Sequence, residues 1–305
     1  MTPLVPLTFF IAGFSKCGTT SLSDLLATHP QIALPSIKEP QFFLEKDFTE
    51  RWSWFRGLFP DDLSGFVAVG ENSNDYSGYA STERMAPLLN SLYPEARYVF
   101  LARDPVARAE SSFRQIHDVG VNYGIECPFD LYESFDVSPG ILLDSNYWRL
   151  MEPFRATVEE ERILVVHFED LISDGGSTID KILSFIGVDP GLLPGDPALP
   201  NSNASSDKLR DTRLLRRIKK ISMFGPRIAR LSLVEQDRIF RPLRLRVRFP
   251  ESYRPDWTPD ALAAFRREVL PGARAFARTY GLPGRGWPRL QQLFGADWLD
   301  RQEEQ

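Results

Sequence analysis

The stretch FFIAGFSKCGTTSL, residues 9–22, decides the fold. An apolar run from Phe9 to Ala12 leads into a loop that contains Gly13 and Gly18, and a helical pattern follows over residues 19–28. The apolar run predicts a buried strand. A strand that passes through a glycine loop into a helix suits a phosphate, because backbone N–H groups and the positive end of the helix dipole converge on the anion. We therefore expect a phosphate-binding loop here.

The lysine of this loop is displaced. A nucleoside-triphosphate loop reads G-x-x-x-x-G-K-[ST], but Thr19 holds the lysine position and Lys16 lies two residues before Gly18. From there a cation meets the far side of a 5′-phosphate and the group that leaves it. The strand expected at residues 98–101 runs into Arg103 rather than an acidic metal ligand. A positive charge suits a second phosphate better than a metal, so we expect no metal site.

Short apolar runs alternate with helical patterns over the first 190 residues. The expected strands are 8–12, 66–69, 98–101 and 163–166, and the expected helices are 19–28, 81–92 with Ser81 as N-cap, one starting at Pro105, and 177–187. The alternation predicts the α/β class, a P-loop-type three-layer fold with a central parallel sheet flanked by helices. Ligands in such folds bind beyond the carboxyl ends of the strands, where all the motifs discussed here would lie.

The C-terminal third carries a strongly basic segment. Between Lys208 and Arg248 there are 14 Lys or Arg and 3 Asp or Glu, a local charge of +11 in a chain whose net charge is −5. We expect a mainly helical insertion over 205–255, broken at Gly225-Pro226, within a single domain spanning 1–305. The segment is either a solvated face or a surface for an anionic ligand, an acidic substrate or membrane headgroups. No familiar nucleic-acid module is visible, so nucleic acid is not expected.

Within this segment, apolar residues alternate with cations, which predicts an amphipathic helix with a broad cationic face. Its expected apolar positions are Leu214, Leu215, Ile218 and Ile221. We favour a role as a lid or acceptor-docking element over contact with anionic lipid. Further on, Thr258 is expected to cap a last helix that breaks at Pro271-Gly272.

The bulk composition is that of an ordinary globular protein. The chain has 305 residues, of which 43% are hydrophobic and 25% charged. Two cysteines, Cys17 and Cys127, are too few for a disulfide framework, and neither a signal peptide nor a spanning apolar run is visible. A reducing, cytoplasmic location is therefore the default expectation.

Several of these stretches together resemble a known family. The segments GFSKCGTTSLSDLLATHPQI, KEPQFF, VFLARDPVARAESSF, RILVVHFEDL, LPNSNASSDKLR and the C-terminal DWTPDALAAFRREVLPGARAFARTYGLPGRGW are similar to sulfotransferases that use 3′-phosphoadenosine 5′-phosphosulfate (PAPS). The likeness is to the bacterial, carbohydrate-type branch, akin to heparan sulfate sulfotransferases. It is weakest at 116–140 and across the basic segment.

The resemblance assigns roles to particular residues. It implies that the first loop binds the 5′-phosphosulfate through Ser15, Lys16, Cys17, Gly18, Thr19, Thr20 and Ser21. It implies that Arg103 and Ser111 hold the 3′-phosphate, and that the loop with Asn203 and Ser205 lies near the nucleotide. PAPS is then the co-substrate and no metal is needed.

Sulfuryl transfer needs a stabilised leaving oxygen and a base for the acceptor hydroxyl. Lys16 serves the first need. The resemblance implies that Glu39 is the first choice of base, and Glu71 and His117 are the other candidates. Pro40 is expected to hold the Glu39 backbone in an extended form that aims the side chain. The alternative is a surface glutamate paired with Lys38.

Two other functions remain open from the sequence. A P-loop kinase would need a Walker lysine and an acidic metal ligand, neither of which can be placed. A non-catalytic nucleotide sensor would need only the binding loop. The acceptor, a sugar or a small-molecule or natural-product hydroxyl, and the oligomeric state are not determined by the sequence.

Overall fold

The computed structural model describes residues 5–120, 125–195, 209–219, 221, 223–229, 231, 233–248 and 254–301. Contacts between Cα atoms divide the chain into two compact units. Unit 1 comprises residues 1–107, 146–202 and 269–305, and unit 2 comprises residues 108–145 and 203–268. The boundary falls inside the helix α4 (Pro105–Val119). A single domain spanning 1–305 stays a prediction.

Unit 1 is built on a five-stranded parallel sheet in the order β2-β3-β1-β4-β5. The strands are β1 (Phe9–Gly13), β2 (Ile32–Ala33), β3 (Ala68–Glu71), β4 (Arg97–Ala102) and β5 (Ile163–His167). Every residue of β1 and β3 is buried, as continuous apolar runs predict for strands covered on both faces. The first strand pairing of β3 is at Ala68, opposite Ile32, so β3 starts two residues later than the sequence indicated.

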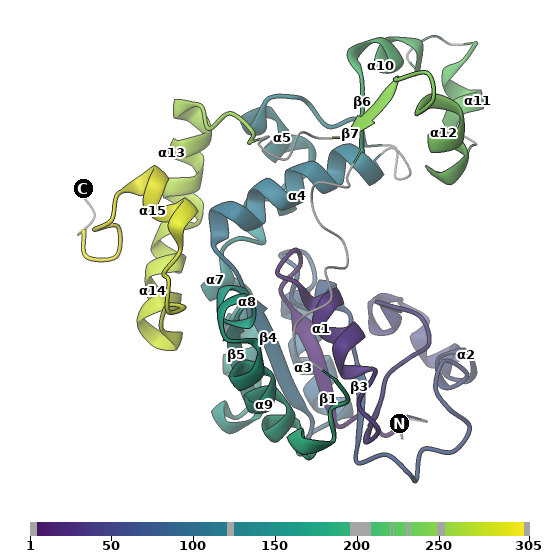
Figure 1. The fold of residues 1–305 in the computed structure, drawn as a ribbon, viewed down its shortest axis with the longest axis vertical. Coiled ribbons are helices and arrows are strands. Elements are labelled where there is room, and N and C mark those ends of the chain that lie inside the picture. Colours follow the sequence, from purple (N-terminus) through teal and green to yellow (C-terminus); the bar gives the residue numbers. More distant parts are fainter. Residues whose placement is uncertain are drawn as a thin grey trace. The chain divides into compact units, whose positions relative to one another are not determined.

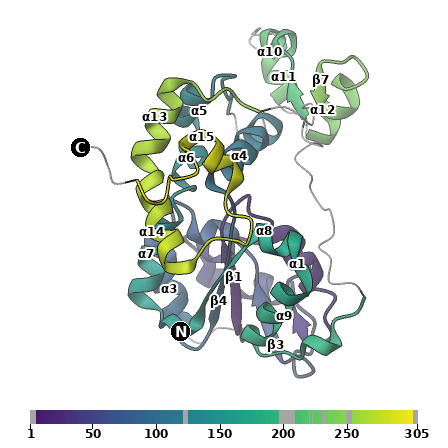
Figure 2. The same ribbon diagram turned by 60° about the vertical axis from the view of Figure 1, so that its left-hand side comes forward.

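Helices cover both faces of this sheet, which confirms the three-layer α/β prediction. Figures 1 and 2 show α1 and α9 on one face and α3 and α7 on the other. The helices of unit 1 are α1 (Thr19–Leu26), α2 (Trp52–Arg56), α3 (Thr82–Leu92), α7 (Tyr147–Thr157), α8 (Phe168–Ser173), α9 (Gly175–Ile186), α14 (Leu270–Tyr280) and α15 (Pro288–Phe294). Short 3-10 helices are η1 (Phe42–Leu44), η2 (Phe48–Glu50), η3 (Asn74–Ser77), η5 (Glu160–Arg162) and η6 (Pro190–Leu192).

One buried carboxylate fixes two helix starts at the sheet edge. The helix α4 begins at Pro105, as predicted, and Asp104 Oδ1 accepts hydrogen bonds from the backbone N–H groups of Val106 (3.0 Å) and Ala107 (3.2 Å). Its Oδ2 accepts from the N–H groups of Arg289 (2.6 Å) and Leu290 (3.1 Å) at the start of α15. Both helices are thereby capped by Asp104.

The start of α3 differs from its prediction. Ser81 precedes α3 at the expected position, but it makes no side-chain capping bond. Its hydroxyl donates instead to the carbonyl oxygens of Asp75 and Gly78 in the preceding turn. Ser81 therefore stabilises the turn after β3 rather than the helix end.

Unit 2 contains the later part of α4 and the basic segment. Its other elements are α5 (Leu131–Val137), α6 (Gly140–Leu143), β6 (Leu209–Asp211), α10 (Arg213–Lys219), α11 (Gly225–Ala229), α12 (Leu233–Phe240), β7 (Arg246–Arg248) and α13 (Pro259–Glu268). The β6 and β7 strands pair antiparallel. A small core of Leu215, Ile228 and Phe240 holds α10, α11 and α12 together.

The helices of the C-terminal third differ slightly from the expected breaks. The basic segment is interrupted just before the expected Gly225-Pro226, because α10 ends at Lys219 and α11 begins at Gly225. Thr258 caps α13, accepting from the N–H of Ala261 at 3.3 Å. The last break falls at Val269 rather than at Pro271-Gly272, because a proline fits the first turn of α14 as well as it ends a helix.

Candidate active site

The predicted phosphate loop joins β1 to α1 at the carboxyl end of the sheet. The N–H of Phe14 donates to the carbonyl of Leu101 at 3.0 Å, which ties the loop to β4. Gly18 has φ 96°, and a Cβ there would lie 2.6 Å from the Phe168 ring, so only glycine fits. The N-cap residue of α1 is Gly18, which has no side chain to satisfy the first-turn N–H groups. First-turn N–H groups lack intrahelical acceptors, so this helix end suits an anion.

The side chains of the phosphate loop differ in how deeply they are buried. Cys17 is fully buried and its Sγ lies 3.4 Å from the Tyr147 hydroxyl oxygen, so it packs rather than reacts. Thr19 and Ser21 are buried, while Ser15, Lys16 and Thr20 are half-buried. Lys16 has φ 68°, in the left-handed region that non-glycine residues seldom occupy. The loop thus holds its one cation in a conformation that costs of order 1–3 kcal/mol.

Asn74, in η3, joins the loop to Glu39. Its Nδ2 donates to Glu39 Oε1 at 2.8 Å and to Thr19 Oγ1 at 3.2 Å. The carboxylate that the sequence singled out is therefore held directly beside the first residue of α1. The structure brings together Lys16, Thr19 and Glu39, three predicted site residues from two separate motifs.

The electrostatic surroundings of Glu39 raise its pKa. Burial is the largest cause, and the nearby Asp75 carboxylate adds to it. The Lys16 charge and the hydrogen bond from Asn74 oppose the shift without cancelling it. A carboxyl with a raised pKa is a better proton acceptor than a solvated one, as a general base requires.

The backbone of Glu39 contradicts one expectation. Pro40 was expected to hold Glu39 in an extended form, yet Glu39 has φ 50°. The hydrogen bond from Asn74 fixes its carboxylate, and Gln41, also at positive φ, donates its N–H to Ser73 Oγ at 2.9 Å. These tertiary contacts on both sides of Pro40 override the local preference.

Lys38 does not pair with the base candidate. Its Nζ forms an ion pair with Asp24 of α1 at 2.7 Å, and both groups are solvent-accessible. The alternative of a surface Glu39 paired with Lys38 is therefore not what the structure contains. Lys38 exerts only the smallest influence on the Glu39 pKa.

Glu71, the second base candidate, is the last residue of β3. It is fully buried, and burial raises its pKa to about 8. Ser73 donates to Glu71 Oε1 at 2.5 Å and accepts from the N–H of Gln41 at 2.9 Å. Gln41 in turn donates through Nε2 to Asp75 at 2.5 Å. Glu71 thus supports the segment that carries Glu39.

Arg103 directly follows β4, and its guanidinium lies over the ring of Phe168. Its guanidinium carbon is 4.9 Å from the centre of the Phe168 ring, the same ring that closes over Gly18. Arg103 is half-buried, and its carbonyl accepts from the Tyr147 hydroxyl at 2.9 Å. The structure thus places a second cation beside the phosphate loop.

The other predicted site residues lie in unit 2 or outside the described residues. Ser111 lies on the part of α4 that belongs to unit 2, so its pairing with Arg103 stays a prediction. Asn203 and Ser205 lie outside the described residues. His117, the third base candidate, is in unit 2, where Arg216 donates to its Nδ1 at 2.6 Å. Burial, with the Arg216 charge, lowers the pKa of His117 to about 3.

Sequence reasoning missed Asn74, Asp75 and Phe168. The stretch Glu71-Asn72-Ser73-Asn74-Asp75 was a signal, because so many polar residues directly after a buried strand are unusual. Phe168 gave none, since an aromatic at a strand end is ordinary. Among the described residues, no group of three His, Cys, Asp or Glu side chains is arranged to hold a metal.

Comparison with known proteins agrees with this geometry. A family model described as "Sulfotransferase domain" matches residues 6–221. The chain belongs to this sulfotransferase domain family. The match covers the phosphate loop, the Glu39 segment and Arg103, all of which lie in unit 1.

Individual relatives are distant. Heparan sulfate glucosamine 3-O-sulfotransferase 3B1 of Mus musculus is 24% identical over 186 residues, covering 58% of this chain and 45% of that protein. Carbohydrate sulfotransferase 15 of Mus musculus is 24% identical over 301 residues, covering 76% and 54%. The chain therefore spans about half the length of these curated relatives.

A solved structure shares the fold. The sulfotransferase from Alicyclobacillus acidocaldarius aligns with a TM-score of 0.51 and 23% sequence identity, over 76% of this chain and 97% of that one.

No helix within the described ranges is both long and apolar enough to cross a bilayer.

Proposed function

We propose that this sulfotransferase-family protein moves the sulfuryl group of PAPS to a hydroxyl of a sugar or of a small-molecule or natural-product acceptor. The observation that carries the proposal is the Asn74 bridge, which holds a carboxylate beside a phosphate-type loop that contains a displaced lysine. Family membership supports the reaction class. The acceptor class is taken from the names of the relatives and from the resemblance.

The residues present fit PAPS. The N-terminus of α1 and the Gly18 turn suit a 5′-phosphosulfate, and Lys16 is the cation within that loop. Arg103, which lies over the Phe168 ring, offers a charge for a 3′-phosphate. Ser111, Asn203 and Ser205 complete the proposed nucleotide site. PAPS, when bound, supplies the activated sulfuryl group.

The roles of the two reactive side chains follow from their surroundings. Asn74 occupies Glu39 Oε1, which leaves Oε2 to take the proton from the acceptor hydroxyl as its oxygen attacks in line. Lys16 stabilises the negative charge that develops on the leaving oxygen. The same half-buried setting that raises the Glu39 pKa also strengthens the pull of Lys16 on that charge.

We infer a reducing compartment, in keeping with the cytoplasmic expectation. Both cysteines are free and buried, and disulfides are rare in reducing compartments. The oligomeric state has no bearing on these assignments.

Nucleotide selectivity tests the proposal. Adenosine 3′,5′-bisphosphate should raise the melting temperature without Mg²⁺. Substituting Arg103 by Ala should weaken its affinity by about 10-fold to 150-fold, the value of a charge-assisted contact, while adenosine 5′-phosphosulfate is hardly affected. Arg155→Ala is the matched control, because Arg155 also stacks on an aromatic ring, that of Trp148.

The outcomes separate the three functions. Preference for Mg-ATP over the bisphosphate would indicate a kinase. Bisphosphate binding with no sulfuryl transfer to any acceptor in a broad hydroxyl screen would indicate a sensor. Equal weakening of both nucleotides by Arg103→Ala would contradict the 3′-phosphate assignment.

A further inference from the structure

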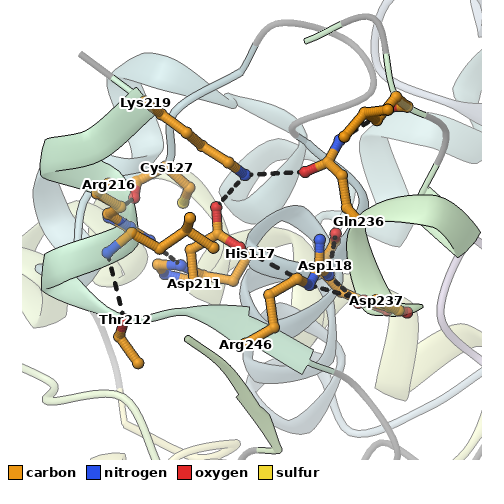
Figure 3. Close-up of polar contacts among 12 residues, drawn as sticks. His117, Asp118, Cys127, Asp211, Thr212, Arg216, Lys219, Gln236, Asp237 and Arg246 are labelled. Carbon is orange, nitrogen blue, oxygen red and sulfur yellow. Dashed lines mark hydrogen bonds and ion pairs between the residues drawn. The ribbon is translucent and has the colours of Figure 1, made fainter. Parts of the chain in front are cut away.

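Two acids of the basic segment form ion pairs with its buried or half-buried cations. Arg246 is fully buried and forms ion pairs with Asp237 (2.8 Å), Asp118 (3.0 Å) and Asp211 (3.7 Å). Lys219 bonds to Asp211 and donates to Gln236 at 3.0 Å. Figure 3 shows these carboxylates gathered around the two cations. Two of the segment's three acids, Asp211 and Asp237, are thus paired with the buried Arg246, since a buried charge needs a partner.

The exposed charged residues of this segment are almost all cations. Among described residues 209–248, the exposed acid is Glu235. The exposed arginines are Arg213 and Arg217 of α10, Arg227 of α11, and Arg238, Arg241, Arg244 and Arg248 around the end of α12 and β7. The exposed charge of the described part of this segment is therefore strongly positive, with seven arginines against one glutamate.

Large apolar side chains stand among these arginines. The exposed ones are Leu214, Ile221, Met223, Phe224, Ile239 and Leu243, with Leu243 63% and Met223 57% accessible. Each lies within four positions of an exposed arginine. They are separate from the small core of Leu215, Ile228 and Phe240. The amphipathic prediction was thus half right, because Leu215 and Ile218 face the core but Leu214 and Ile221 do not.

We propose that these exposed arginines and apolar side chains, the cationic–apolar surface, dock on a bilayer that carries anionic phospholipid. The arginines complement lipid phosphates and acidic headgroups, and the apolar side chains enter the boundary with the acyl chains. An acidic polysaccharide or a nucleic acid would satisfy the arginines but leave exposed Leu, Met and Phe side chains without a partner. The proposal is independent of the sulfuryl-transfer reaction.

The placement of the surface on short helices suits this role. Figures 1 and 2 both show α10, α11, α12 and the β6–β7 pair grouped at the C-terminal end of α4. Ile221, Met223 and Phe224 occupy the turn between α10 and α11, and Leu243 occupies the turn between α12 and β7. Side chains at turns can enter a headgroup layer without unpacking the core beneath them.

Vesicle flotation with the full chain tests the proposal. The chain should float with phosphatidylcholine vesicles that contain phosphatidylserine and remain in solution with phosphatidylcholine alone, and high salt should weaken the binding. Arg213→Gln with Arg217→Gln should reduce the affinity roughly 25-fold, about fivefold for each arginine. Phe224→Ser with Leu243→Ser should reduce it by about tenfold or more.

Matched variants elsewhere control for charge and exposure. Arg266→Gln with Arg267→Gln removes two exposed arginines of α13, and Tyr132→Ser with Ile172→Ser removes two exposed large apolar side chains. Neither pair should change flotation. Unfolding of each variant is followed by circular dichroism, and all should melt like the parent because the substituted residues are exposed.

Three results would overturn the proposal. One is no flotation with anionic vesicles at low salt. Another is a loss of flotation in the control pairs equal to that in the test pairs. The third is sensitivity to the arginine pair alone, with a soluble acidic polysaccharide competing for the protein, which would assign the surface to an acidic polymer instead.

Discussion

At the scale of single residues, the site depends on two residues whose backbone is held at positive φ. Lys16 and Glu39 both adopt backbone angles that most residues avoid, and both were singled out as reactive groups. Strain of this kind persists only where surrounding contacts impose it. For Glu39 the contact is the Asn74 bond, and for Lys16 it is the tight turn between Phe14 and Gly18.

Removal of Lys16 should impair chemistry far more than folding. We expect Lys16→Ala to lower turnover by at least about 100-fold, the scale of losing one transition-state charge donor. Lys38→Ala is the control, since Lys38 is an exposed lysine of the same region that pairs with Asp24. Steady-state rates of sulfuryl transfer measure both. Near-normal turnover in Lys16→Ala would exclude Lys16 from the mechanism.

The Glu39 carboxylate should set the acid side of the pH profile. Because its pKa is raised, activity should rise with pH through a midpoint above that of an ordinary glutamate. Glu39→Gln should retain nucleotide binding but lose most transfer and this pH dependence. Asn74→Ala removes a bond that lowers the pKa, so its residual activity should rise at a still higher pH. Glu45→Gln, an exposed glutamate of the same loop, is the control.

The competing assignment gives the opposite pattern. If Glu71 were the base, Glu71→Gln would be inactive and Glu39→Gln active, and the acid midpoint would lie near pH 8. A pH–rate profile of each single variant distinguishes the two cases.

At the scale of elements, the turn from β3 into η3 is the structural support of the site. Glu71 ends β3, Asn74 begins η3, and between them Ser73 links the buried carboxyl to the backbone of Gln41. The turn therefore ties the segment that carries Glu39 to the end of β3. The sequence predicted the strand but not this linkage.

Glu71 should make stability depend on pH. Its pKa rises from an ordinary 4.5 to about 8 on folding, so the folded state favours the protonated form. The contribution is fully present below pH 4.5, is lost progressively as pH rises towards 8, and changes no further above that. Glu71→Gln mimics the protonated form, so its stability relative to the parent should increase across that range, by of order a few kcal/mol.

Denaturant unfolding at several pH values measures this difference. Glu83→Gln is a control on an exposed position of α3. A stability difference between Glu71→Gln and the parent that does not change with pH would show that Glu71 ionises normally in the folded protein.

At the scale of the whole molecule, the division into two units separates the site from the basic segment. The phosphate loop, Glu39 and Arg103 belong to unit 1, and the segment after residue 205 belongs to unit 2. Lid closure over the nucleotide and membrane docking are separate predictions for this segment, each with its own test.

Hydrogen exchange across residues 206–250 tests the lid. We expect adenosine 3′,5′-bisphosphate to increase protection there, because ordering of the segment would cover the nucleotide. Residues 163–167 of β5 serve as an internal reference whose protection should not change. Equal exchange with and without nucleotide and acceptor would exclude a lid and leave the outer surface as the segment's role.

The sequence by itself determined the sheet class, the loop and its displaced lysine, and Arg103. These features depend on local order along the chain: an apolar run followed by glycines fixes a strand, a turn and a helix start in that succession. The pairing of Glu39 with the loop was proposed only through resemblance. Its physical basis, Asn74, lies 35 residues further along the chain and 55 from Thr19.

Only the tertiary structure decided which polar groups meet and which charges face inward. Local preference placed Glu39 in extended backbone, and long-range hydrogen bonds overrode it. Composition gave the basic segment its total charge, but the structure decided that Asp211 and Asp237 pair with the buried Arg246, while Glu235 and most of the described arginines are exposed. Both outcomes depend on contacts between residues far apart in the sequence. The order of residues within one short segment does not predict such contacts.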